Sequence, residues 1–147
     1  MKKILCVNGP NLNLLGTREP DKYGTTTLSD IEKKLKEEAL KLDIEIAFYQ
    51  SNIEGEIVER IQQAREHFDG IVLNAGAYTH TSIAIRDAIT SASMPVVEIH
   101  MSNIYNREDF RQKSLIAPVC VGQISGFKAD SYKLGLKGLV NYLNNKK

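Results

Sequence analysis

The sequence lacks the features of a membrane protein or of a protein that binds nucleic acid. No apolar segment approaches the ~20 residues that a membrane-spanning helix needs. The 19 basic residues nearly balance the 18 acidic ones, so the formal net charge is +1. The terminal pair Lys146-Lys147 is too small to form a basic patch. Because such patches attract the phosphates of nucleic acids and acidic membranes, we expect neither partner.

The sequence also has only two cysteines and nothing that resembles a secretory signal. Cys6 and Cys120 both lie in short apolar runs, where a free thiol usually acts as a small core residue. The opening Met1-Lys2-Lys3 leads into a short apolar run that ends at Asn8, unlike a signal peptide. Because thiols stay reduced in the cytoplasm, the sequence predicts a cytoplasmic protein.

Several kinds of catalytic centre lack their parts. No Gly-x-Ser-x-Gly segment is present to position the nucleophile of a serine hydrolase. A zinc site would need a third ligand beside His80 and His100, and no histidine or cysteine spacing supplies one. The lysines cluster on polar helix faces, whereas a Schiff-base lysine must be desolvated. We therefore expect neither a metal nor a covalent lysine intermediate.

Apolar runs and helical periodicities alternate along the 147 residues, of which 42% are hydrophobic and 25% charged. These values are typical of one soluble globular domain. We expect strands at residues 4–7, 44–49, 71–73, 95–100 and 118–121. Helices are expected at residues 28–42, where Thr27 fits an N-cap, and at 57–68, 82–91 and 132–143. This alternation predicts an α/β fold, a flavodoxin-like, doubly wound parallel sheet of order 2-1-3-4-5 with helices on both faces.

Polar residues gather where three of the predicted strands end. These segments are Asn8 to Asn13, Asn74 to Ser82 and Glu98 to Asn103. In doubly wound sheets, ligands bind beyond the carboxyl ends of the strands, near the point where the strand order reverses. The sequence therefore predicts a functional site at this edge of the sheet.

Two residues of the fourth strand form a candidate acid. Glu98 and His100 are two apart, so they share one face of an extended strand. A carboxylate in that position orients an imidazole and raises its pKa, which prepares a general acid. Alternatively, Glu98 caps a neighbouring helix and His100 is an ordinary loop histidine. His80, in the loop after the third strand, either binds a hydroxyl or faces solvent.

A candidate base lies in the glycine-bracketed segment 16–24, which we expect to be a mobile lid. Ionising a phenol of pKa ~10 at pH 7 costs about 4 kcal/mol. A guanidinium about 4 Å away, at an effective dielectric of 20, returns on the order of 4 kcal/mol. Arg18 beside Tyr23 could therefore supply a tyrosinate near neutral pH. The alternative is an ordinary surface turn built on Glu19-Pro20-Asp21.

These groups favour the removal of a proton next to a carbonyl, followed by acid-assisted loss of a hydroxyl. Tyr23 would remove the proton, His100 would help to expel the hydroxyl as water, and Asn13 and its neighbours would stabilise the enolate oxygen.

Two other functions of flavodoxin-like folds remain as alternatives. A flavin phosphate would need free backbone N–H groups after the first strand, where Pro10 removes one and Leu12 adds bulk. A phosphoacceptor receiver module would need acidic residues where Asn8 and Asn74 stand. Both fit the sequence less well than acid–base chemistry.

Taken in order, these segments resemble type II 3-dehydroquinate dehydratase over essentially the whole chain. The matching segments are Asn8 to Asn13, Gly16 to Gly24, Asn74 to Ser82, Glu98 to Asn103, Arg107 and Phe110-Arg111. The resemblance implies the dehydration of 3-dehydroquinate to 3-dehydroshikimate in the shikimate pathway of aromatic amino-acid biosynthesis. It implies an anti elimination through an enolate, without a metal or an organic cofactor.

The resemblance also assigns catalytic roles. The base of the family maps to Tyr23 and its lid arginine to Arg18. The general acid maps to His100 with Glu98 as its partner. Asn13 matches a residue that holds the water supporting the enolate.

Substrate-binding positions and an assembly follow from the same resemblance. Asn74, His80 and Arg111 match substrate-binding positions, and Met101 and Ser102 match those whose backbone amides bind the ring carboxylate. Asp87 matches a residue that a neighbouring subunit donates within a trimer, and four trimers form a dodecamer. One stretch departs from the family: after Gly126-Phe127, Lys128-Ala129-Asp130 stands where a further glycine is common. We expect it to lie away from the motif residues.

Overall fold

Five parallel strands form one sheet in the order β2-β1-β3-β4-β5, as the sequence predicts. The computed structural model describes residues 1–17, 19, 21 and 24–145. The strands are β1 (Lys2–Asn8), β2 (Ile44–Gln50), β3 (Gly70–Asn74), β4 (Val96–His100) and β5 (Gly122–Ser125). All residues of β1, β3 and β4 except Lys2 and Lys3 are buried, because helices cover both faces of the sheet.

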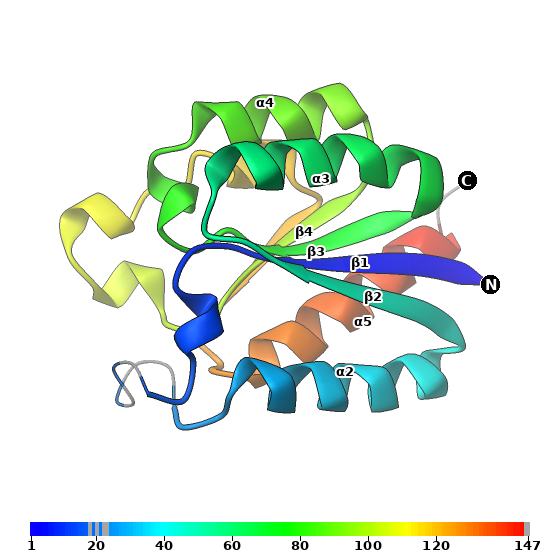
Figure 1. Ribbon diagram of the computed structural model, residues 1–147, viewed down its shortest axis with the longest axis horizontal. Coiled ribbons are helices and arrows are strands. Elements are labelled where there is room, and N and C mark those ends of the chain that lie inside the picture. Colours follow the sequence, from blue (N-terminus) through cyan, green and yellow to red (C-terminus); the bar gives the residue numbers. More distant parts are fainter. Residues whose placement is uncertain (18, 20, 22–23, 146–147) are drawn as a thin grey trace.

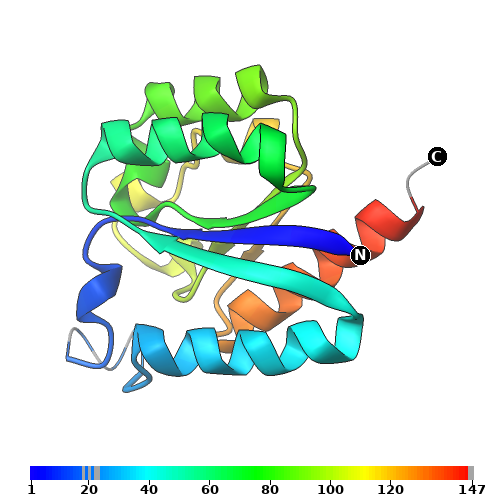
Figure 2. The same ribbon diagram turned by 45° about the vertical axis from the view of Figure 1, so that its right-hand side comes forward.

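The helices lie in two layers (Figures 1 and 2). α3 (Glu54–His67) and α4 (Ile83–Ala92) cover one face, and α2 (Leu28–Leu42) and α5 (Asp130–Asn145) cover the other. Each layer encloses its own apolar core, one around Ile57, Ile61 and Ile89, the other around Leu35 and Leu136. None of the described helices is long and apolar enough to cross a membrane.

The predicted N-cap of α2 is confirmed. The Thr27 hydroxyl accepts a hydrogen bond from Asp30 N at 3.1 Å, and the Asp30 carboxylate accepts one from Thr27 N at 3.1 Å. This reciprocal capping satisfies two backbone donors that the first turn of a helix would otherwise leave without partners.

The predicted position of the fifth strand is wrong. Residues 118–121 do not form the strand: Ala117–Val119 make a 3₁₀ turn, and β5 starts at Gly122, paired with Val97. The reason is Pro118, which has no N–H for the ladder and a fixed φ that suits the start of a turn. Cys120 therefore lies in the connection to β5, while Cys6 lies within β1 as predicted. Burial raises the pKa of both thiols to about 12.

The carboxyl ends of β1, β3 and β4 open into short 3₁₀ turns that gather at one edge of the sheet (Figure 1). These turns are η1 (Leu12–Leu14), η2 (Gly76–His80), η3 (Ile104–Asn106) and η4 (Asp109–Arg111). Gly9 lets the loop after β1 approach the loop after β3 closely. A Cβ at this position would lie only 2.6 Å from the Ala75 carbonyl oxygen. The turns thus bring the polar segments after β1, β3 and β4 together.

Candidate active site

Glu98 and His100 form a buried pair at the end of β4, as their spacing predicts. Glu98 is fully buried, His100 is 5% exposed, and His100 Nε2 and Glu98 Oε2 share a hydrogen bond. Glu98 also accepts hydrogen bonds from Ser114 Oγ at 2.9 and 3.0 Å and from Gln123 Nε2 at 3.1 Å. These bonds come from side chains, so the alternative of a helix-capping glutamate is wrong. Because Nε2 is bound, Nδ1 is the nitrogen of His100 that remains for a ligand.

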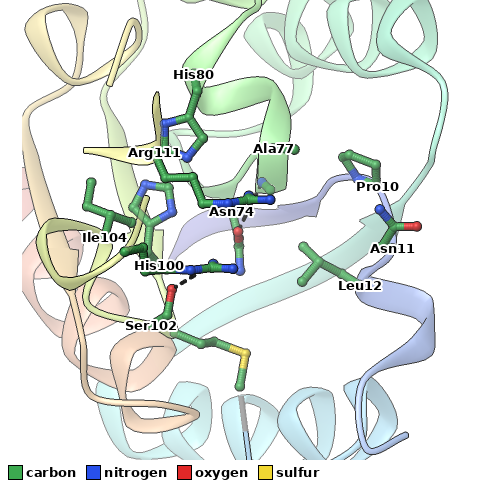
Figure 3. A pocket seen from close by; sticks show the side chains of 13 residues that line it. Pro10, Asn11, Leu12, Asn74, Ala77, His80, His100, Ser102, Ile104 and Arg111 are labelled. Carbon is green, nitrogen blue, oxygen red and sulfur yellow. Dashed lines mark hydrogen bonds between the residues drawn. The ribbon is translucent and has the colours of Figure 1, made fainter. Parts of the chain in front are cut away.

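His100 opens into a pocket at this edge of the sheet (Figure 3). Figure 3 shows His80, His100 and Arg111 on one side, across from Pro10, Asn11 and Leu12. The lining residues are Pro10, Asn11, Leu12, Asn74, Gly76, Ala77, His80, His100, Met101, Ser102, Ile104, Arg107 and Arg111. The fold therefore brings together six of the predicted site residues: Asn74, His80, His100, Met101, Ser102 and Arg111. Within the described part of the chain, no group of three or more His, Cys, Asp or Glu residues could hold a metal ion.

His80 lies on the pocket wall, with its ring stacked near that of His100 at a centroid distance of 6.3 Å. Its Nδ1 donates a hydrogen bond to the carbonyl oxygen of Lys113 at 2.8 Å, so Nδ1 carries a proton. Burial lowers the pKa of His80, and the nearby charges of His100 and Arg111 lower it further. A neutral ring protonated at Nδ1 leaves Nε2 free to accept a hydrogen bond from a hydroxyl.

We predict that His80 titrates below its ordinary pKa of ~6.5. Because folding lowers this pKa, the unfolded chain binds the proton more readily. The contribution of His80 to stability is thus present above pH ~6.5 and is lost as the pH falls through the folded value. NMR titration of the ring protons, assigned with His80→Gln, measures the midpoint. A midpoint at or above 6.5 would contradict the prediction.

Two arginines supply positive charge to the pocket. Arg111, a predicted binding residue, donates from Nε to Glu108 Oε1 at 3.2 Å. Arg107 donates from Nη1 to Ser102 Oγ at 3.2 Å, and its side chain is only 9% exposed. Arg107 belongs to the segments that resemble the family but is not among the predicted site residues. Its position after the β4 loop was the signal that could have identified it.

The two asparagines after β1 differ in their access to the pocket. Asn13, predicted to support the enolate, lies on η1 with an exposed side chain. Among the described residues that line the pocket is Asn11 rather than Asn13. Asn11 has a φ of 69° and directs its backbone N–H to Asn52 Oδ1 at 3.0 Å. Asn11 is not among the predicted site residues, because alternating asparagines look equivalent in sequence until the turn sets the directions of their side chains.

For three predicted site residues, the place in the site stays a prediction. Asp87 is exposed on α4 and is not one of the described lining residues. Its predicted role needs a neighbouring subunit and stays a prediction. Arg18 and Tyr23 lie outside the described residues.

The segment that contains Arg18 and Tyr23 has two described residues with contacts near the pocket. Glu19 Oε2 lies 3.7 Å from Arg107 Nη2, and the Asp21 carbonyl oxygen accepts a hydrogen bond from Lys128 Nζ at 3.1 Å. The expectation that Lys128 lies away from the motif residues is therefore wrong. The φ of Lys128 is 51°, a left-handed value that glycine adopts without strain.

Comparison with known proteins gives one family. The family model described as "Dehydroquinase class II" matches residues 2–140. A 3-dehydroquinate dehydratase from Geotalea daltonii is 60% identical, over 96% of this chain and 98% of that protein. One from Trichodesmium erythraeum is 57% identical, over 97% of this chain and 95% of that protein.

Solved structures show the same similarity. The type II dehydroquinase from Butyrivibrio crossotus superposes with a TM-score of 0.92 and 46% identity, over 94% of this chain and 97% of that chain. The type II dehydroquinase from Propionibacterium acnes has a TM-score of 0.92 and 38% identity, over 96% and 97% of the two chains.

Proposed function

The chain belongs to the class II dehydroquinase family, and we propose that its pocket dehydrates 3-dehydroquinate to 3-dehydroshikimate, a step of the shikimate pathway. The buried pair of Glu98 and His100 carries this proposal. It presents one imidazole nitrogen to a pocket that also contains amide, imidazole and guanidinium groups. Such a set suits the loss of water from a hydroxylated carboxylate, which needs a general acid and several oriented donors.

The first step is proton removal from the carbon next to the substrate carbonyl. Tyr23 acts as the base in its phenolate form, and Arg18 stabilises that anion. The C–H electron pair moves into the carbonyl group and forms an enolate. The sequence spacing and the family support this assignment. The contact of neighbouring Glu19 with Arg107, which lines the pocket, agrees with it.

In the second step the enolate collapses and the C–O bond to the leaving hydroxyl breaks. His100 donates its Nδ1 proton to the departing oxygen, which leaves as water. Glu98 accepts the Nε2–H bond throughout, so it holds the ring in one orientation and stabilises the protonated imidazole. Base and acid act on opposite faces of the ring, which gives an anti elimination without a metal or an organic cofactor.

The remaining polar groups hold the substrate. Arg111 and the backbone amides of Met101 and Ser102 bind the carboxylate, and Arg107 steadies Ser102 through its hydroxyl. Asn74 donates to a ring oxygen, and His80 accepts a hydrogen bond from a hydroxyl. The pKa of His80, lowered by burial, favours the neutral ring that this role requires.

The assembly is part of the proposal. Four trimers form a dodecamer in the cytoplasm, and Asp87 of each subunit reaches the site of its neighbour. The exposed position of Asp87 on α4 and the resemblance to the family support this arrangement. In a trimer, exposed residues of one subunit can complete the pocket of the next.

An ultraviolet assay tests the proposed activity directly. 3-Dehydroshikimate contains a conjugated enone that 3-dehydroquinate lacks, so we expect absorbance to rise when the purified protein meets 3-dehydroquinate. Heat-denatured protein is the control for spontaneous loss of water. No rise above this control, with a folded protein, would overturn the proposal. Purified protein that is yellow would instead favour a bound flavin.

A further inference from the structure

A buried tyrosine hydroxyl links the ends of β1 and β3 beneath the pocket. Tyr132, on α5, is fully buried. Asn8 and Asn74 are also buried, with exposed fractions of 1% and 4%. The Tyr132 hydroxyl lies 2.5 Å from Asn8 Oδ1 and 3.0 Å from Asn74 Nδ2. A helix from the end of the chain thus contacts both central strands at the point where the strand order reverses.

The chemistry of the three groups sets the direction of each hydrogen bond. Asn8 Oδ1 can only accept, so the Tyr132 hydroxyl donates to it. Asn74 Nδ2 can only donate, so the Tyr132 oxygen accepts from it. Burial raises the pKa of Tyr132, which keeps the phenol protonated at neutral pH.

These bonds orient the Asn74 amide. Its Oδ1 accepts a hydrogen bond from Gly76 N at 3.1 Å, while one N–H of Nδ2 is bound to Tyr132. The second N–H of the same nitrogen remains for the pocket that Asn74 lines (Figure 3). If the amide flipped, Nδ2 would face the Gly76 N–H and Oδ1 would face the Tyr132 oxygen. Only the observed orientation therefore satisfies both partners.

We propose that Tyr132 is a positioning residue, which holds Asn74 so that an N–H donor faces an oxygen of the substrate. The inference rests on the proposed function, because it concerns the binding role of Asn74. Tyr132 does not touch the substrate; it acts through the amide. It lies 58 residues from Asn74 in the sequence.

The chain offers a matched control for this proposal. Tyr132→Phe removes the acceptor of Asn74 Nδ2. Asn8→Ala leaves that acceptor in place and removes the acceptor of the Tyr132 hydroxyl, together with the hydrogen bond from Asn8 Nδ2 to Cys6 Sγ. Both variants break a buried hydrogen bond at the same oxygen, so both are expected to lower the melting temperature. If Tyr132 had only a structural role, KM would rise in both variants in step with their loss of melting temperature.

The test measures KM and kcat of both variants with 3-dehydroquinate. We expect Tyr132→Phe to raise KM about three- to tenfold, with a smaller change in kcat, and Asn8→Ala to leave KM within about twofold. In an Asn74→Ala background, Tyr132→Phe should change KM no further, because the two residues act as one unit. An unchanged KM in Tyr132→Phe, an equal rise in Asn8→Ala, or additive effects would overturn the proposal.

A second measurement needs neither activity nor a substituted protein. Hydrogen exchange of the Asn74 side-chain amide, followed by NMR in the unsubstituted protein, should show one strongly protected proton. Rapid exchange of both protons would overturn the proposal even if Tyr132→Phe folds poorly. An unsubstituted protein with no turnover would count against the proposed function alone, because the amide measurement is independent of it.

Discussion

Tyr23→Phe is expected to lower kcat by about a thousandfold, within the range that a general base contributes. The substitution removes one hydroxyl and leaves an aromatic ring of nearly the same size. Without the phenolate, no other group assigned to this reaction removes the carbon-bound proton. The rate of enone formation at saturating 3-dehydroquinate measures the loss, and KM should change much less.

The control for this substitution is Tyr142→Phe. Tyr142 is partly exposed on α5, and it is not among the described residues that line the pocket. The variant Tyr142→Phe should therefore keep nearly full turnover. If Tyr23→Phe also does so, another residue is the base. Arg18→Gln gives a further check, because the loss of the cation should move the basic limb of the pH–rate profile to higher pH.

His100→Gln is expected to lower kcat by about a hundredfold, at the lower end of the contribution of a general acid. A glutamine amide can still donate a hydrogen bond to Glu98, so the buried carboxylate keeps a partner and the fold should persist. The amide cannot transfer a proton to the leaving hydroxyl. Steady-state kinetics with 3-dehydroquinate measures kcat, and circular dichroism checks the fold.

His67→Gln is the matched control for His100→Gln. His67 ends α3 and is exposed, so its substitution should leave kcat unchanged. A second expected result concerns pH. We expect the limb of the pH–kcat profile that reports the general acid to be present in the unsubstituted protein and absent in His100→Gln. Retention of more than about a tenth of the rate would show that another group or water protonates the leaving oxygen.

Local patterns were enough to predict most of the fold. Among the described residues, buried apolar runs and helical periodicities indicated four of the five strands and all four long helices, because burial on both faces of a parallel sheet leaves continuous Val, Ile and Leu runs. Thr27 was identified as an N-cap because it directly precedes the apolar stripe of the helix, and its partner Asp30 is only three residues away. The fifth strand was misplaced because an apolar run through Pro118 looked like a strand.

The site was predictable only where its contacts are local in sequence. Glu98 and His100 were paired from a spacing of two residues on a strand. The partners that hold Glu98 are not local: Ser114 and Gln123 lie 16 and 25 residues away. Nothing in the spacing of these polar residues marks them, because chain connections of different lengths bring them to the carboxylate.

The sequence by itself determined the alternating fold, the edge of the sheet at which the polar loops meet, and the paired acid on β4. These follow from the periods of strands and helices, which reflect which faces are buried. Tertiary structure alone decided that Asn11 rather than Asn13 lines the pocket, that Lys128 contacts Asp21, and that Tyr132 orients Asn74. Such contacts depend on turn geometry and on the packing of distant elements, which leave no repeating pattern in the chain.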